Sequence, residues 1–260
     1  MIRAMMALMR LEYRKMLGGW KILWLGFLTL LPLLGMGIAH GVLGENDRLL
    51  NLAIGMFMNY PNGICVLTAL LYGSSIISTE LENKTLSYLF TRPIPKWLVL
   101  IGKYVGFCVC LCALVAISVS LTFLAVGKPK GGTWLLSYIK VSAIAIFAYG
   151  AIFTLVGLVF PRRAIIAGLV VALVEFITAL IPSVAKEFTV THYLRALLWN
   201  DLKEFFGFQS RSALGMDFVR SMNEVARWEA YLTLGLIIAI ALTLACFLLH
   251  RRELNVTEKV

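Results

Sequence analysis

Apolar residues gather in this chain in blocks long enough to cross a lipid bilayer, and this feature constrains the fold more than any other. About 20 consecutive apolar residues span the hydrocarbon layer as a helix. The chain has 260 residues, of which 60% are hydrophobic and 15% charged, whereas soluble domains are nearer half apolar and a quarter charged. The sequence therefore predicts an all-α integral membrane protein with no separate soluble domain.

The blocks predict six transmembrane helices within a single transmembrane domain that covers residues 1–260. We expect the spans, in chain order, at residues 20–39, 56–78, 104–126, 137–160, 164–181 and 230–249. Pro32 lies inside the first span and predicts a kink, because proline removes a helical hydrogen bond and clashes with the preceding turn.

The positions of Lys and Arg predict the orientation. Six spans place both ends of the chain on one side, and basic residues are in excess there, in the two ends, in 79–103 and at Arg162 and Arg163. Since cytoplasmic loops are enriched in Lys and Arg, we expect a multi-pass protein of the plasma (inner) membrane with cytoplasmic termini. Three basic residues in or near one outer loop run against this trend: Lys128, Lys130 and Lys140.

The net charge of +10 lies beside apolar spans, where basic residues meet anionic lipid, so membrane lipid is an expected partner and nucleic acid is not.

Residues 1–19 alternate apolar and charged residues, which predicts an amphipathic interfacial helix, with a disordered tail as the alternative. In the outer segment, residues 183–229, two apolar stripes predict interfacial or re-entrant helices. A small folded outer domain is the alternative there.

The connection 79–103 is predicted to contain a short helix. Thr79 and Glu82 have the spacing of a capping box, and prolines at 93 and 95 end the helix. Its apolar and aromatic face has nothing in the small cytoplasmic part of the chain to cover it, which predicts a partner protein. The alternative is a helix that lies on lipid headgroups.

Residues 80–106, ELENKTLSYLFTRPIPKWLVLIGKYVG, resemble the stretch between spans two and three of ABC-2 type permeases, the membrane subunits of one class of ABC exporters. In that family one or two acidic residues precede a Gly-Thr-Leu run. An Arg/Ser-Pro step and a basic residue follow, and Gly-Lys opens the third span. The matching positions are Glu80, Glu82, Thr85, Leu86, Arg92, Pro93, Lys96, Gly102 and Lys103. Lys84 departs from the family, which usually has Gly there.

The resemblance implies six helices per subunit and a dimer whose midline forms an export path. It also implies a coupling helix at about 80–91, seated on a separate ABC-type ATPase subunit, present in two copies, which would carry ATP and Mg²⁺. The candidate ATPase-coupling residues are Glu80, Glu82, Lys84, Leu86, Tyr88, Leu89 and Arg92. The second permease of the dimer is either another copy or a homologous chain.

The function that follows is the permease subunit of an ATP-driven exporter. Its substrate is unidentified, and the apolar spans favour an amphipathic or lipid-like molecule. The alternative is a non-transporting membrane anchor or signalling subunit bound to the same ATPase. A secondary transporter is disfavoured, because such proteins usually carry several acids or polar breaks at mid-membrane.

The sequence predicts no catalytic residue and no metal site. It lacks the GxxxxGK[ST] phosphate loop, the HExxH metal motif and the GxSxG nucleophile turn. The cysteines fall inside apolar blocks, where they are expected as packing residues: Cys65, Cys108, Cys110, Cys112 and Cys246. The chain is therefore not expected to be an enzyme by itself.

Glu175 is the one acidic residue deep inside a predicted span. A lone acid at the bilayer centre costs roughly 2.5 kcal/mol or more, so it should face protein or a watery cavity. It is therefore a candidate for a cation or proton site, or for a polar contact in the substrate path. An interhelical hydrogen bond, or a side chain reaching toward the outer side, is the structural alternative.

Overall fold

The computed structural model describes residues 20–43, 60, 63–76, 78, 96–125, 132–180, 189–206 and 225–257. Within these residues the chain forms helices and no strands, which confirms the all-α prediction for this part of the protein. The labelled elements are α2 (Trp20–Leu43), α6 (Lys96–Ala125), α7 (Gly132–Val159), the 3-10 turn η1 (Pro161–Arg163), α8 (Ala164–Leu180), α9 (Val190–Phe206) and α12 (Arg227–Thr257). A further apolar helix covers Gly63–Gly73.

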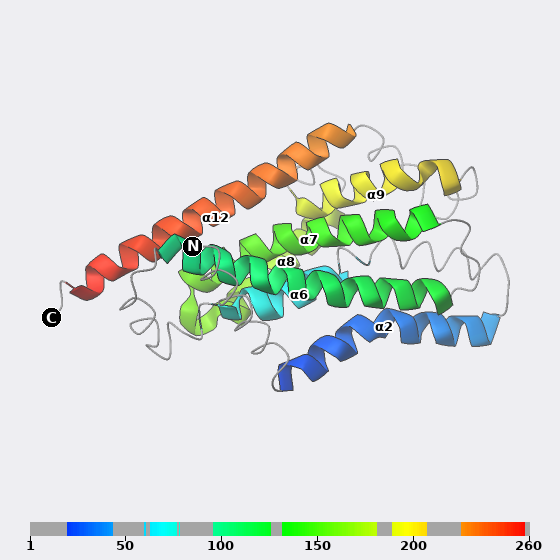
Figure 1. The fold of residues 1–260 in the computed structure, drawn as a ribbon, viewed down its shortest axis with the longest axis horizontal. Coiled ribbons are helices and arrows are strands. Elements are labelled where there is room, and N and C mark those ends of the chain that lie inside the picture. The colour runs from blue at the N-terminus through cyan, green and yellow to red at the C-terminus, as the bar shows by residue number, and fades with distance from the viewer. Residues whose placement is uncertain are drawn as a thin grey trace.

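Helix α7 is the centre of the bundle. It contacts α6, α8, α9 and α12, while α2 packs on the far side of α6 (Figure 1). Tyr138, Ala145 and Tyr149 of α7 are fully buried. Because α7 touches almost every other labelled helix, a displacement of α7 must be accommodated by most of the bundle.

The long helices alternate in direction. The amino-terminal ends of α2 and α6 lie at the same end of the bundle as the carboxyl-terminal ends of α7 and α12 (Figure 1). Figure 1 also shows α2 bending near its middle, and Pro32 lies inside that helix. The alternation is the one expected for successive spans, and the six-span topology itself stays a prediction.

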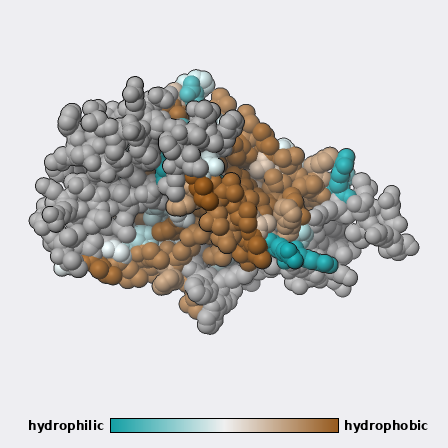
Figure 2. Space-filling model, turned by 180° about the vertical axis from the view of Figure 1, so that it is seen from behind, coloured by the Kyte–Doolittle hydropathy of each residue, from teal (hydrophilic) through white to brown (hydrophobic). Residues whose placement is uncertain are grey.

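Three helices of the described residues are long and apolar enough to cross a membrane: Trp97–Leu124, Leu135–Val159 and Arg227–Arg251. The outward faces carry large apolar side chains, and Figure 2 shows apolar surface across the middle of the molecule. On α8 the exposed ones are Ile165, Ile166, Leu169, Val170, Leu173, Val174, Phe176 and Ile177. Large exposed apolar surfaces of this kind are stable against lipid, not against water.

Two helices extend beyond the predicted spans. Helix α6 begins at Lys96, whereas its span was expected from residue 104, and α12 runs from Arg227 to Thr257 around the expected 230–249. The added first turns of α6 bury Leu98, Val99 and Leu100. Packing against the rest of the bundle stabilises these turns, and hydropathy alone does not reveal such packing.

Glycines allow the helix at 63–73 and the residues after it to lie directly against α7. A Cβ at Gly157 of α7 would clash with the backbone of Ser74, and a Cβ at Gly73 would lie 3.1 Å from the Cβ of Phe153. Backbones approach this closely only where a side chain is missing.

Replacing Gly157 by Ala should destabilise the protein by about 1–3 kcal/mol, because the added methyl group meets backbone atoms that cannot rotate away. Thermal unfolding of the purified protein in detergent, followed by fluorescence, measures the effect. Gly26→Ala in α2 is the control, since nothing lies within 4 Å of a Cβ there. Equal unfolding midpoints for the two variants would contradict this packing.

Candidate functional site

The predicted coupling residues, Glu80 to Arg92, lie outside the described residues. From the 79–103 connection, the structure describes the first turns of α6, which include Gly102 and Lys103. Lys103 is only 1% exposed and therefore lies within the bundle. The polar groups that the structure does bring together lie on α7, α8, α9 and α12.

Glu175 of α8 binds the amino-terminal end of α9. Its Oε1 accepts the backbone N–H of Thr191 at 3.0 Å and the hydroxyl of Tyr149 at 3.1 Å. The Tyr149 hydroxyl also lies 2.9 Å from Oγ1 of Thr191. Glu175 therefore has the interhelical hydrogen bonds that were one of its two predicted explanations, and it joins α7, α8 and α9.

These contacts supply acceptors at the start of α9, where backbone N–H groups have no intrahelical acceptor. The Glu175 carboxylate accepts the N–H of Thr191 in the first turn of α9. Thr189 accepts the N–H of His192 through its own hydroxyl, in the manner of an N-cap residue. A carboxylate at a helix amino terminus is also favoured by the helix dipole.

Helix α9 lies antiparallel to α7 inside the bundle. Thr191 meets Tyr149 near its start and Asp201 meets Lys140 near its end, so residue numbers rise on α9 as they fall on α7. The two contacts are 10 residues apart on α9 (201 − 191) and 9 on α7 (149 − 140), about 14 Å along the axes. Helix α9 thus starts beside the middle of α7 and runs toward its beginning. Its assignment as a re-entrant or interfacial helix stays a prediction.

The apolar stripe of α9 packs on protein. Leu194, Leu197 and Leu198 are at most 1% exposed, although the sequence placed this stripe on the outer membrane face. Arg195 lies on the same helix near Tyr149. The stripe alone does not distinguish a lipid surface from a helical neighbour, because both are apolar.

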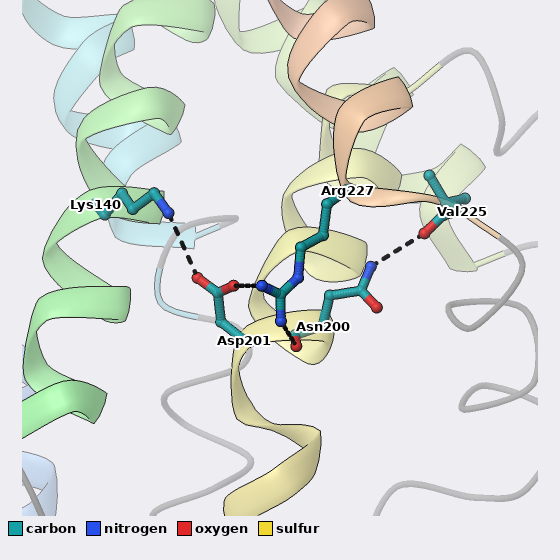
Figure 3. Close-up of polar contacts among 5 residues, drawn as sticks. All are labelled: Lys140, Asn200, Asp201, Val225 and Arg227. Atoms are coloured by element: carbon teal, nitrogen blue, oxygen red, sulfur yellow. Dashed lines mark hydrogen bonds and ion pairs between the residues drawn. The ribbon is translucent and has the colours of Figure 1, made fainter.

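A second polar cluster joins the other end of α9 to α7 and α12 (Figure 3). The Asp201 carboxylate lies 3.9 Å from Nζ of Lys140 and 3.7 Å from Nη1 of Arg227. Arg227 also donates through Nη2 to the Asn200 carbonyl at 2.5 Å, and Asn200 donates through Nδ2 to the Val225 carbonyl at 3.0 Å. Sequence spacing does not connect these residues, so the sequence does not predict this cluster.

A third group of polar contacts joins α2 to α6. The Tyr60 hydroxyl donates to Oγ of Ser118 at 3.1 Å, and Ser118 Oγ donates to the backbone carbonyl of Thr29. Thr29 lies one turn before Pro32, whose missing N–H leaves the carbonyl four residues earlier, that of Leu28, without its helical donor. The Ser118 bond to the neighbouring Thr29 carbonyl therefore joins α6 to α2 close to the proline.

These clusters join helices and do not have the composition of a catalytic or metal centre. Within the described ranges, no group of three or more His, Cys, Asp or Glu residues is arranged to hold a metal ion. Cys65, Cys108 and Cys110 are buried free thiols, and Cys112 and Cys246 are partly buried. The carboxylates at residues 175 and 201 are bound by neighbouring donors and cations.

Replacing Glu175 by Ala should destabilise the protein by about 1–3 kcal/mol, because the buried N–H of Thr191 loses its acceptor. Glu175→Gln should cost less, since its amide oxygen can still accept that bond. Thermal unfolding in detergent measures both variants. Thr178→Ala is the matched control one turn along α8, where the hydroxyl bonds only within its own helix. A Glu175→Ala variant as stable as this control would exclude the capping role.

Comparison with known families identifies the chain. The model of the ABC-2 family transporter protein matches residues 6–254, close to the full length. A search of curated proteins finds no match. The family match confirms the resemblance drawn from residues 80–106, and with the apolar helices it indicates a multi-pass membrane protein that is a transporter component associated with an ABC ATPase. The chain belongs to the ABC-2 family of transporter proteins.

Proposed function

We propose that this chain is the permease subunit of an ATP-driven exporter and that a separate subunit hydrolyses the ATP. The observation that carries the proposal is the family match over residues 6–254 of a chain built from apolar helices. Two ATPase subunits would hold ATP and Mg²⁺, and a second permease, identical or homologous, would complete the export path.

The packing of α6 supports a mechanical route from the coupling segment into the bundle. Helix α6 starts at Lys96, soon after the predicted coupling residues, and its Tyr104 hydroxyl donates to the Phe147 carbonyl of α7 at 2.6 Å. Helix α7 in turn contacts α8, α9 and α12. A displacement of α6 would therefore reach α8, α9 and α12 through α7. ATP binding would need to favour one arrangement by about 5.5 kcal/mol to reverse the populations fully.

The exposed charges support the proposed orientation. Arg162 and Arg163 lie exposed beside the carboxyl-terminal end of α7, and Arg251 is exposed near that of α12. These helix ends share one end of the bundle in Figure 1. An excess of basic residues marks the cytoplasmic side, so we place this end, with both chain termini, in the cytoplasm. The other end then faces outward, and transport proceeds toward it.

Two measurements test the function together. A mild-detergent pull-down of the full chain, read by mass spectrometry, should recover an ABC-type ATPase. The recovered complex, reconstituted in vesicles, should move a fluorescent lipid-like probe with ATP, and a variant ATPase without its phosphate-loop Lys should not. Recovery of the ATPase without ATP-dependent movement of any amphipathic probe would favour the non-transporting anchor. Purification without an ATPase would contradict both.

Reversing the charge of both Glu80 and Glu82 to Lys should reduce ATPase recovery about tenfold or more. Reversal of interface charges typically costs more than the 1.4 kcal/mol that corresponds to a factor of ten. The matched control is Glu229→Lys, an exposed acid in the first turn of α12 at the other end of the bundle. Equal recovery with both variants would remove the proposed coupling role from these two acids.

We propose that Glu175 also contributes a polar contact to the substrate path. Glu175→Gln keeps an acceptor for Thr191 and removes the charge, so it should slow ATP-driven transport in vesicles while ATPase recovery stays unchanged. Wild-type transport by this variant would remove Glu175 from the path and leave its structural role alone.

A further inference from the structure

Two exposed cations share one sheltered carboxylate at the outward end of the bundle. The side chains of Lys140 and Arg227 are 54% and 55% exposed, whereas that of Asp201 is 11% exposed. The distances of 3.9 and 3.7 Å exceed the roughly 2.7–2.9 Å of a charge-assisted hydrogen bond. One carboxylate therefore does not saturate the donors of two cations, and the cluster keeps a positive charge on its exposed side.

The nearest acid on α12 does not cancel this charge. Glu229 follows Arg227 by two residues, and residues two apart project to opposite sides of a helix. Its carboxylate accepts the N–H of Ala226 at 3.3 Å. On the side of Arg227, one turn further, lies Tyr231, and Nζ of Lys140 lies 5.4 Å from the centre of its ring.

The cluster lies where apolar spans begin. The candidate spans start at Leu135 on α7 and at Arg227 on α12. Trp228 is 66% and Tyr231 36% exposed beside the cations, and this pairing of aromatic and basic residues is typical of the membrane–water boundary. Toward the middle of the membrane, Leu232 is 56% exposed, and nothing lies within 4 Å of a Cβ at Gly235.

We propose that Lys140 and Arg227 bind the phosphate of an anionic glycerophospholipid in the leaflet at this end of the bundle. The phosphate supplies the second negative charge that the cluster lacks, at the depth of lipid headgroups. Trp228 and Tyr231 flank the glycerol region, and an acyl chain follows α12 past Leu232 and Gly235. The site does not depend on transport or on the ATPase.

The effect of Asp201→Asn on lipid binding distinguishes a phosphate site from a cluster that only joins helices. If Lys140 and Arg227 serve only to join α9 to its neighbours, then Asp201→Asn loosens the region and does not improve binding of anything. If they bind a phosphate, Asp201 competes with it for the same cations. Its removal then raises lipid occupancy.

The experiment uses the full chain, purified with whatever partner accompanies it, in vesicles of phosphatidylcholine that contain a photoactivatable phosphatidylglycerol. Mass spectrometry quantifies labelling of peptides that include residues 136–147 and 227–236. Lys140→Gln and Arg227→Gln should each lower labelling about fivefold, the usual contribution of one basic residue at an anionic surface. Asp201→Asn should raise it, and Lys140→Arg should preserve it. Arg251→Gln, an exposed cation at the other end of α12, is the control and should have no effect.

Three results would overturn the proposal. One is equal labelling of wild type, Lys140→Gln and Arg227→Gln. Another is lower labelling by Asp201→Asn, which would assign the cluster to helix joining. The third is loss of labelling when inorganic phosphate is added at constant ionic strength, which would point to a free anion. If thermal unfolding shows that a Gln variant is not folded, the labelling of Asp201→Asn and Lys140→Arg decides the question.

Discussion

The structure depends on one constraint: a polar group inside a bilayer has no water to bind, so its partners must come from other parts of the protein. The start of α9 is the clearest case. A helix that begins beside the middle of α7 places N–H groups without intrahelical acceptors among buried side chains. Glu175, reaching from α8, and Thr189, just before the helix, accept these N–H groups. The acid that looks anomalous in the sequence therefore stabilises the start of this helix.

The two ends of α9 are held by different chemistry, because they differ in exposure. Near its start, Glu175, Tyr149 and Thr191 form hydrogen bonds with one another in a sheltered position. Near its end, Asp201 pairs with Lys140 and Arg227 at longer distances, and the side chains of these two cations are more than half exposed. Solvent shares the charge of exposed cations, so longer ion pairs suffice there. Both ends of α9 contact α7.

Hydropathy and charge predicted the helical class and a multi-pass membrane protein, because the cost of placing polar residues in lipid is a property of composition. The family followed from residues 80–106 and is confirmed by the match over 6–254. The coupling residues themselves stay a prediction, since they lie outside the described residues.

The sequence by itself determined that this chain forms apolar helices and that Glu175 requires a partner. Only the tertiary structure decided which partner it has. Tyr149 and Thr191 are far from Glu175 in sequence, and the stripe containing Leu194 and Leu198 fits lipid and protein equally well. In the sequence, Lys140 counts only among the basic residues in or near an outer loop. The structure places Asp201 of α9 beside it. Local sequence fixes which groups must be satisfied, whereas the packing of distant helices fixes which groups satisfy them.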